Sequence, residues 1–299
     1  MPRTLLALIA FICGGPTAAF AWGDLGHQIV GIIAYSRLTA TAKKNVDALL
    51  TADKDELTAT DFVSRNTWAD KYRDSDRRTT KLRYEATRNW HFVDVELATG
   101  DIDAACADHP KLPRGTAASA GPANSCVIDK IEQFSAELRD RLVPKTEKIV
   151  ALKFLLHFIG DLHQPLHAAD NNDRGGNEVP VLFGPGHTLT NLHFYWDNYV
   201  VESLGSDSRA TGALLSKQIG NSSAGRWSTG TTIAWARESF KQAKSVAYNF
   251  TGLAQFTDDR GAIGVRLDSS YENVAAVAAR EQLMKAGVRL ATLLNNIMR

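Results

Sequence analysis

Two short segments of the chain repeat the same pairing of a histidine with an aspartate four residues later. In FLLHFIGDLHQPLH the pair is His157 and Asp161, and in NLHFYWDN it is His193 and Asp197. Residues four apart lie above one another on the same face of an α-helix, so each pair presents an imidazole together with a carboxylate. Because a buried carboxylate needs a partner for its charge, the repetition predicts bound metal ions rather than two isolated core histidines.

Other side chains of the same kind extend this set. Pro165 ends the first helix, so we expect His167 to turn away from the axis towards a second ion. The set contains five histidines, three aspartates and no cysteine, which suits zinc or another borderline divalent metal better than a thiolate-type structural site. The predicted side-chain ligands are His27, Asp70, His91, His157, Asp161, His167, His193 and Asp197.

A further ligand is expected at the start of the mature chain. Arg3 is followed by an apolar stretch, and Ala19-Phe20-Ala21 forms a small-x-small cleavage site, which together are typical of a secretory signal peptide. Cleavage after Ala21 gives Trp22 a free α-amine beside its own carbonyl oxygen, and these two atoms can chelate a metal. With a pKa of about 7.7 to 8.0, the amine loses its proton readily to a metal near neutral pH. We therefore expect Trp22 to bind the same ion as His27.

Length and charge narrow the class of protein. After residues 1–21 are removed as a signal peptide, residues 22–299 contain no Pro-, Ser- or Gly-rich linker and are expected to form one domain. Loss of Arg3 reduces the 34 basic residues to 33, equal to the 33 acidic residues. Bulk charge therefore predicts neither a nucleic acid nor a membrane as partner. We expect an exported, periplasmic or extracellular protein without a membrane span.

The remaining pattern predicts a mostly α fold. Long apolar segments follow the helical rather than the alternating period, and only residues 177–190, with Gly184-Pro185-Gly186 at the turn, resemble a small β-hairpin. In an oxidising compartment we expect Cys106 and Cys126 to form a disulfide. The expected helical segments are 29–38, 128–142, 149–162, 232–248 and 271–298, the last with a packing stripe of Val277, Met284, Val288, Ala291 and Leu294.

Three histidines are expected to play no part in metal binding. His163 lies six positions after His157, about 120° around a helix of 3.6 residues per turn, and is interpreted as a packing residue. His109, inside the expected disulfide loop, and His187, in the hairpin turn, are expected at the surface.

The motifs resemble those of the zinc-dependent single-strand-specific nuclease family, which includes fungal enzymes, plant bifunctional nucleases and bacterial homologues. The resemblance spans much of the chain and rests on several motifs rather than on one. These are Trp22, Gly23-x-x-Gly26-His27, Trp68-Ala69-Asp70, Trp90-His91-Phe92-Val93-Asp94, His157-x-x-x-Asp161, Gln164-Pro165-Leu166-His167, Gly175-Gly176-Asn177 and Asn191-Leu192-His193-x-x-x-Asp197.

The resemblance implies one mostly helical domain, residues 22–299, with a small β-hairpin and a cluster of three zinc ions. It implies hydrolysis of phosphodiester bonds in single-stranded DNA and RNA to 5′-phosphate products, together with 3′-nucleotidase activity. Asp70 and Asp161, with Arg73 nearby, would be catalytic. The implied ligand sets are Asp70, His91, His157 and Asp161 for one ion, Trp22 and His27 with a shared Asp161 for the second, and His167, His193 and Asp197 for the third.

Substrate contacts are expected close to these ligands. By the resemblance, Phe92 stacks on a base while Asp94 and Asn177 hydrogen-bond to its edge, and Arg73 is expected to contact a phosphate oxygen. Stacking tolerates any base but requires an unpaired one, which favours single-stranded DNA, RNA and nucleotides as partners. The basic run from Arg73 to Arg88 either guides a phosphate backbone or forms a solvated face.

Two other functions remain possible from the motifs. A zinc-dependent phospholipase C has the same N-terminal tryptophan and similar ligands, and a zinc-scavenging protein would bind the metal without turnover. Phe92, Asp94 and Asn177 favour a nucleobase over a lipid, and no exposed apolar stretch favours a membrane. No obligate protein partner is indicated.

Overall fold

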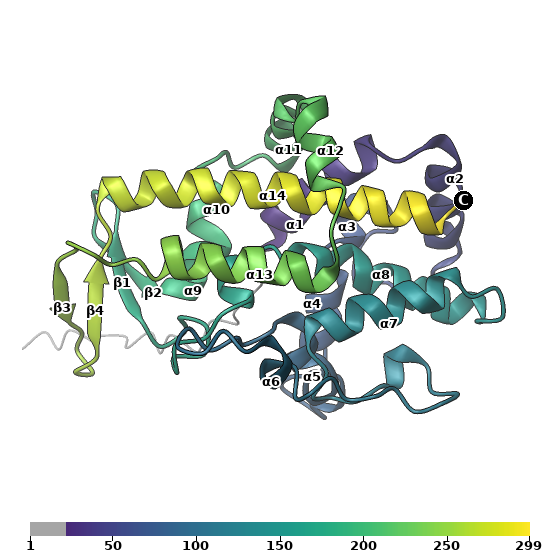
Figure 1. Ribbon diagram of the computed structural model, residues 1–299, viewed down its shortest axis with the longest axis horizontal. Coiled ribbons are helices and arrows are strands. Elements are labelled where there is room, and N and C mark those ends of the chain that lie inside the picture. The colour runs from purple at the N-terminus through teal and green to yellow at the C-terminus, as the bar shows by residue number, and fades with distance from the viewer. Residues whose placement is uncertain (1–21) are drawn as a thin grey trace, which may run out of the picture.

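A computed structural model describes residues 22–299 as a mostly helical fold with a small sheet at one end (Figure 1). The predicted fold class is confirmed. The predicted signal peptide and its cleavage site after Ala21 lie outside the described residues. Among residues 22–299, none of the helices combines the length and the apolar character needed to cross a membrane.

The long predicted segments are all helical, with ends that differ by a few residues. Local signals explain several of these ends, because Thr231 and Asp268 accept hydrogen bonds from the first-turn N–H groups of Ala234 and Tyr271 and so cap two of the helices. The helices are α1 (Asp24–Ser36), α7 (Val127–Arg139), α8 (Lys145–Asp161), α13 (Thr232–Gln242) and α14 (Ser269–Ile297).

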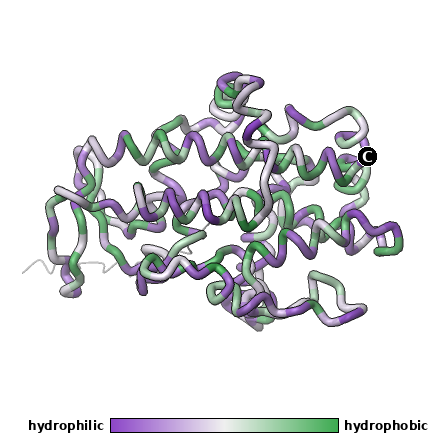
Figure 2. Tube along the Cα trace, viewed as in Figure 1, coloured by the Kyte–Doolittle hydropathy of each residue, from purple (hydrophilic) through white to green (hydrophobic). Residues whose placement is uncertain are grey.

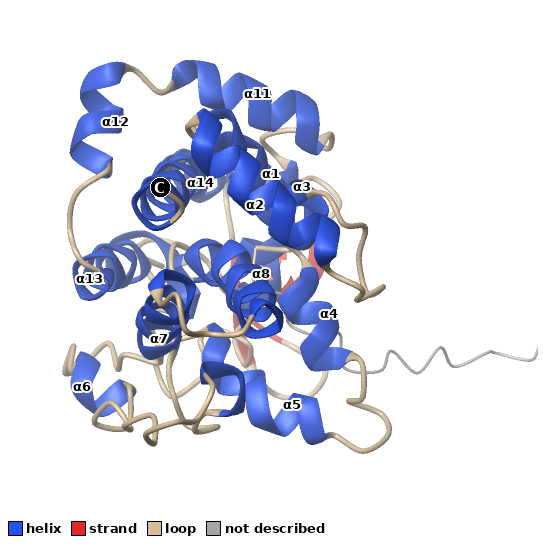
Figure 3. Cartoon of the chain, turned by 90° about the vertical axis from the view of Figure 1, so that its right-hand side faces the viewer, coloured by secondary structure: helices blue, strands red, loops and turns tan. Residues whose placement is uncertain are grey.

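Helix α8 is the central element of the fold. Every residue from Ala151 to Asp161 is buried, as expected for a helix that is apolar on nearly all sides. Helices α1, α7 and α14 pack against it, and Figure 3 shows it in the middle of the helices, viewed nearly end-on. A side chain near the end of α8 is therefore placed by packing on all sides.

Helix α14 runs the length of the molecule, and its trace alternates between polar and apolar residues (Figures 1 and 2). Of the predicted stripe, Val288, Ala291 and Leu294 are buried and Met284 packs against the core. The expectation for Val277 is wrong, since this side chain is 59% exposed. In this part of α14 the buried face is formed instead by Ala275 and Ala279.

Shorter helices connect these long elements. Three 3₁₀ turns cover Arg88–His91, Ala118–Ala120 and Pro165–His167, and two π-helical segments cover Tyr195–Tyr199 and Ala243–Ala247. The short α-helices are α2 (Ala40–Ala52), α3 (Phe62–Arg65), α4 (Trp68–Asp74), α5 (Leu82–Thr87), α6 (Ile102–Ala105), α9 (Leu192–Phe194), α10 (Val200–Glu202), α11 (Ser208–Gln218) and α12 (Asn221–Trp227).

The predicted hairpin is present as β1 (Pro180–Phe183) and β2 (Thr188–Asn191), and the sheet is larger than predicted. A second hairpin, β3 (Gln255–Thr257) and β4 (Ile263–Arg266), joins it to give the strand order β2-β1-β4-β3. Strands β1 and β4 pair in parallel, although they are far apart in the sequence. Gly264 permits this close approach, because a Cβ atom there would lie 2.6 Å from the carbonyl oxygen of Pro180.

Candidate metal centre and substrate cavity

The eight predicted side-chain ligands come from several elements and meet in the interior. Each is less than one-tenth exposed. Helix α1 supplies His27, α4 supplies Asp70, and the end of α8 supplies two ligands, His157 and Asp161. The others are His91 and His167 from 3₁₀ turns, His193 from α9, and Asp197 from the π-helical segment that follows it.

The carboxylate of Asp161 lies at the centre of this arrangement. Its Oδ1 is 3.3 Å from Nε2 of His27. Its Oδ2 is 3.0 Å from Nδ1 of His91 and 3.3 Å from Nε2 of His157. The two oxygens of one carboxylate therefore face histidines from different elements, which is the geometry that a shared ligand requires.

Asp70 completes this half of the centre. Its Oδ1 lies 3.5 Å from Nδ1 of His91 and 3.5 Å from Nε2 of His157. The ligand atoms of His27, Asp70 and His157 all lie within 4.8 Å of one another, as do those of His91, His157 and Asp161. These two overlapping groups have His157 in common.

The second half of the centre contains the remaining three ligands. Nε2 of His193 is 3.1 Å from Nε2 of His167 and 3.3 Å from Oδ2 of Asp197. The ligand atoms of all three residues lie within 4.8 Å of one another. The helical pairing of His193 with Asp197, which the sequence predicts, is maintained although the segment winds as a π-helix.

Backbone carbonyl groups fix the tautomers of three of these histidines. Nδ1 of His157 donates to the carbonyl of Asn66 at 2.7 Å, Nδ1 of His167 to that of His91 at 2.9 Å, and Nδ1 of His193 to that of Gly175 at 2.7 Å. A carbonyl oxygen only accepts, so each Nδ1 carries a proton and Nε2 is the ring nitrogen that faces the centre. Hydrogen bonds of this kind orient metal-binding histidines.

The centre has more acceptors than protons to satisfy them. The Nε2 atoms of His167 and His193 face each other as two lone pairs. Buried polar atoms are nearly always hydrogen-bonded, yet several here have no hydrogen-bond partner among the described residues. They are both ring nitrogens of His27, Nε2 of His91 and His157, Oδ1 of Asp161 and Oδ2 of Asp197. This donor set fits bound divalent cations.

The pKa values of His91 and His193 agree with neutral, metal-binding rings, whereas nearby carboxylates raise that of His157 to about 10. Burial lowers the pKa of His91 to about 4 and that of His193 to about 3, so both rings are neutral at pH 7. Burial also raises the pKa of Asp197 well above its ordinary value. Neutral imidazoles are metal ligands, and a buried carboxylate whose charged form is disfavoured needs a nearby cation.

Glycine permits the close approach of α1 and α8 at the centre. A Cβ atom at Gly160 would lie 2.7 Å from Nδ1 of His27, so a larger residue would displace this ring. The predicted N-terminal ligand lies nearby, because Trp22 is buried and the next residue, Gly23, donates its N–H to the carbonyl of Asp197 at 2.8 Å. The structure thus places Gly23, the residue after Trp22, beside the second half of the centre.

A cavity of about 840 Å³ opens onto these ligands. His91, His167 and His193 line it together with Arg73 and with the three predicted base contacts, Phe92, Asp94 and Asn177. Four more arginines line its walls, namely Arg77, Arg88, Arg174 and Arg260. Cationic walls and an aromatic ring beside a candidate metal centre suit an anionic substrate that carries a flat base.

Comparison with known proteins identifies the family. A profile of the S1/P1 nuclease family matches residues 22–299.

The chain belongs to the S1/P1 nuclease family.

Three relatives of this nuclease match over most of their length. It is 29% identical to nuclease S1 of Aspergillus oryzae, over 99% of this chain and 98% of the relative. It is 29% identical to endonuclease 2 of Arabidopsis thaliana, over 92% and 90% of the two chains. It is 28% identical to nuclease P1 of Penicillium citrinum, over 92% and 97%. The protein is therefore a nuclease, a hydrolase of phosphodiester bonds in nucleic acids, and the predicted family is confirmed.

Arg73 of this nuclease has partners within the protein. Its Nη1 lies 2.7 Å from Oδ1 of Asp70, and its Nε and Nη2 each lie 2.9 Å from the carboxylate of Asp74. Burial raises the pKa of Asp70, but the charges of Arg73 and His157 lower it more, so the net shift is well below the ordinary value. The guanidinium group therefore stabilises a charged candidate ligand while it also lines the cavity.

Asp94, like Asp197, has a raised pKa. Burial, followed by the neighbouring charges of Asp170 and Glu96, raises its pKa to about 7. Within the predicted base-binding group, the side-chain amide of Asn177 donates to the carbonyl of Arg174 at 2.9 Å. Asp94 thus lines the cavity as a carboxyl group that titrates near neutral pH.

The structure assigns a positioning role to Gln164, which sequence reasoning noted in a motif without giving it a role. Its amide nitrogen donates to Oδ1 of Asp197 at 2.7 Å, and its amide oxygen accepts from the N–H of Leu166 at 2.6 Å. Gln164 therefore holds a candidate ligand while it caps the turn that carries His167. A Gln-Pro pair directly after a metal-binding helix was the available sequence signal.

The three histidines outside the centre have different environments. His163 is a buried packing residue as predicted, with Nδ1 donating to the carbonyl of Ile159 and Nε2 accepting from Arg289, and His187 is exposed as predicted. His109 differs from the expectation, because its side chain is only 32% exposed and lies between two carboxylates. The predicted disulfide between Cys106 and Cys126 is confirmed.

Proposed function

We propose that this nuclease is an exported three-zinc enzyme that hydrolyses single-stranded DNA and RNA to 5′-phosphate products and also removes 3′-phosphates from nucleotides. Residues 22–299 would form its catalytic domain. The observation that carries the proposal is one cavity, with Phe92 at its side, that is lined by His91, His167 and His193 from two of the three buried groups of nitrogen and oxygen ligands.

The proposed ligand sets follow the resemblance. Asp70, His91, His157 and Asp161 would hold one zinc ion, and Asp161 would be shared with a second ion held by His27 and by the α-amine and carbonyl oxygen of Trp22. The third ion is held by His167, His193 and Asp197. The different neighbours of the two Asp161 oxygens support this division.

Zinc ions bound in this way would polarise the scissile phosphate, lower the pKa of water and neutralise the leaving oxygen. The side chains of the protein would position the zinc ions and the substrate. Asp70 and Asp161 keep the negative charge of the ligands at the centre, and Gln164 holds Asp197 in place. Arg73, between Asp70 and the cavity, adds a fixed positive charge where the negative charge of the substrate gathers.

Recognition of an unpaired base would depend on Phe92. The ring is partly exposed and lines the cavity two residues before Asp94. A base stacked on Phe92 would place its polar edge near Asp94 and Asn177, and a base held in a duplex offers neither its face nor that edge. The structure therefore supports a preference for single strands without a requirement for one sequence.

The cavity arginines would hold the phosphates on either side of the scissile bond. Arg77 and Arg88 belong to the basic run whose role the sequence left open, and both line the cavity. Arg174 and Arg260 come from later in the chain and line the same space. Binding that depends on such contacts weakens as salt rises, because the phosphates recover their counterions.

Export is proposed from the sequence and from the extent of the family match. The match begins at Trp22, the residue that follows the predicted cleavage site. A buried disulfide is also typical of proteins outside the reducing cytoplasm.

Elemental analysis of the chain that begins at Trp22, together with product analysis on single-stranded RNA, tests the proposal. We expect three zinc ions per chain and mononucleotides that end in a 5′-phosphate. A different metal content or 3′-phosphate products would contradict it. Comparable turnover of phosphatidylcholine would instead favour the phospholipase C alternative.

A further inference from the structure

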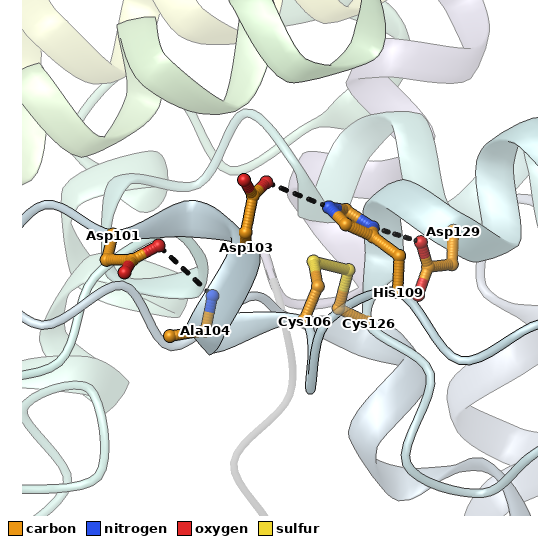
Figure 4. The surroundings of a disulfide bond; sticks show 7 residues. All are labelled: Asp101, Asp103, Ala104, Cys106, His109, Cys126 and Asp129. Atoms are coloured by element: carbon orange, nitrogen blue, oxygen red, sulfur yellow. Dashed lines mark hydrogen bonds and ion pairs between the residues drawn. A yellow bond between two sulfur atoms is a disulfide. The ribbon is translucent and has the colours of Figure 1, made fainter.

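A fourth group of metal-ligating side chains lies outside the centre described above. It consists of Cys106, His109, Cys126 and Asp129, called the cysteine corner here, where the end of α6 meets the start of α7 (Figure 4). The ligand atoms of these four residues all lie within 4.8 Å of one another. None of the four belongs to the candidate centre, and two of them carry sulfur.

His109 is held in the corner by two carboxylates. Its Nδ1 lies 2.6 Å from Oδ1 of Asp129, and its Nε2 lies 3.1 Å from Oδ1 of Asp103 (Figure 4). Nδ1 of His109 thus faces Asp129, which belongs to the corner, and Nε2 faces Asp103, which lies outside it. Metal-bound histidines have this arrangement, in which the ring nitrogen remote from the metal donates to a carboxylate.

The backbone of the corner adopts an unfavourable conformation that keeps His109 in place. Ala107, Asp108 and His109 have φ angles of 49°, 55° and 54°. Three consecutive residues with side chains in the left-handed region are unusual, because each costs conformational energy, and such strain gathers at functional sites. The bend returns the chain towards the sulfur atoms within three residues of Cys106.

Three of the four residues of the corner are buried, and His109 is partly exposed. Both cysteines are almost fully buried, and Asp129 is 9% exposed. The second oxygen of Asp129, Oδ2, is buried and has no hydrogen-bond partner among the described residues. A buried carboxylate oxygen without a donor is a free ligand position next to His109 and the two sulfur atoms.

We propose that the cysteine corner, when its disulfide is reduced, is a tetrahedral site for zinc or a similar divalent ion, with Cys106, Cys126, His109 and Asp129 as ligands. Two thiolates, one imidazole and one carboxylate complete four coordination positions, which is typical of a structural rather than a catalytic site. Disulfide formation and metal binding are alternatives, since both use the same two sulfur atoms.

Conversion of the disulfide form into the metal-bound form requires two electrons, which a dithiol can supply as the reductant. The dithiol gives two electrons and two protons to the Cys106–Cys126 bond, which breaks to leave two thiols, and the dithiol becomes a disulfide. Binding of a divalent ion then releases the two thiol protons, because the thiolate is the ligand. An oxidising compartment favours the disulfide, and a reducing one frees both thiols for the metal.

Either crosslink closes the same loop beside the segment that carries His91. The N–H of Val127, next to Cys126, donates to the carbonyl of Phe92 at 3.0 Å, and the indole of Trp90 donates to the carbonyl of Pro122 at 2.9 Å. The loop from Cys106 to Cys126 therefore supports the segment on both sides of His91. A metal in the corner would keep this support when the disulfide is absent.

Cobalt(II) titration of the chain that begins at Trp22 tests the proposal. This chain lacks Cys13, so Cys106 and Cys126 are its only thiols. The disulfide is reduced with a phosphine, which is then removed in the absence of oxygen. We expect the reduced protein to bind one more cobalt ion than the oxidised protein and to show thiolate-to-cobalt charge-transfer absorption in the near ultraviolet, which nitrogen and oxygen ligands do not produce.

Variants separate the corner from other sites. His109→Gln and Asp129→Asn should each weaken cobalt binding at the corner by more than about tenfold, and Cys106→Ser with Cys126→Ser should abolish the charge-transfer band. His187→Gln, at an exposed histidine of the hairpin turn, is the matched control and should change neither. Nuclease activity of the oxidised variants should persist, because the proposed catalytic centre contains no sulfur.

Three results would overturn the proposal. One is a reduced protein that keeps its helical circular dichroism but binds no additional cobalt. Another is an undiminished affinity in His109→Gln. The third is loss of helical circular dichroism on reduction even with cobalt present, since the site requires the folded loop. Each is distinguishable from failure of the proposed nuclease mechanism, which is read from the oxidised protein.

Discussion

Asp161 directs its Oδ1 atom towards Nε2 of His27 at 3.3 Å, although the two residues are more than a hundred positions apart and lie on different helices. Its other oxygen faces His91 and His157. The geometry makes Asp161 a side chain whose two oxygens face histidines of different helices, including His27 of the first helix. Changes at Asp161 should therefore affect two ions at once.

Asp161→Asn should reduce nuclease activity by more than about 100-fold. Substitution of a residue that only hydrogen-bonds to a metal ligand typically costs about 10- to 100-fold, and loss of a shared ligand should cost more. The amide cannot bring a negative charge to either ion, so zinc content should fall together with the rate. Asp197→Asn, at a ligand in only one proposed group, should lose less zinc. Elemental analysis and initial rates provide the comparison, and three retained ions with near-normal turnover would show that Asp161 is not shared.

A chain that begins at Trp22 should bind one zinc ion more than a chain in which Ala21 still precedes it. In the longer chain the nitrogen of Trp22 is an amide and has no available lone pair, while every side-chain ligand is the same. Zinc stoichiometry and nuclease rate are to be compared after circular dichroism has shown similar folding. Equal zinc content and activity would contradict the proposal that processing creates a ligand.

Phe92→Ala should weaken substrate binding by about 1 to 3 kcal/mol, the range for removal of a base-stacking ring. Zinc content should not change, because Phe92 is not among the proposed ligands. Bis(p-nitrophenyl) phosphate, which has no nucleobase, should be hydrolysed at nearly the same rate by both proteins. Equal losses on this ester and on RNA would identify Phe92 as a structural residue.

Base preference should depend on pH through Asp94, whose pKa burial raises to about 7. Above that pH the carboxylate only accepts hydrogen bonds and suits the N–H donors of guanine, whereas below it the neutral acid also donates and suits cytosine. The ratio of kcat/KM for dinucleotides with guanine or cytosine beside the scissile bond should rise with pH, by about tenfold for one charge-assisted hydrogen bond.

Asp94→Asn provides the control for this dependence. The amide does not titrate, so the ratio should be independent of pH near 7, while effects of pH on the metal centre cancel between the two substrates. A constant ratio in the parent protein, or the same inflection in Asp94→Asn, would exclude a role for Asp94 in base recognition.

Arg260→Ala should reduce the salt dependence of oligonucleotide binding. Its side chain is 84% exposed at the wall of the cavity, so its removal should lower the slope of log affinity against log salt by about one. Arg280→Ala, at an exposed arginine that does not line the cavity, is the matched control. Identical slopes for the two variants would show that Arg260 contacts no phosphate.

Several parts of the site were predictable because they depend on spacing within one helical turn. The pairs His157 with Asp161 and His193 with Asp197 share a helix face in any right-handed helix, and α8 is buried as its apolar sequence requires. The disulfide followed from the number of cysteines and the expected compartment. The family match confirms the nuclease assignment that these motifs supported.

Other parts depend on contacts between distant segments, which local spacing does not encode. The pairing of β1 with β4, separated by most of the C-terminal helical region, produced a larger sheet than one hairpin. Val277 is exposed because the neighbours of α14, rather than its own periodicity, decide which face is covered. His109 is enclosed because the backbone turns back at Ala107.

The sequence by itself determined which side chains could bind metal and that most of them stand on helices, since ligand chemistry and helical periodicity are local properties. Only the tertiary structure decided which oxygen of Asp161 faces which histidine, that Arg73 is paired with Asp70 and Asp74, and that Gln164 holds Asp197. These relationships follow from the packing of several helices around α8, where each position is set by the volume and hydrogen bonds of residues far away in the chain.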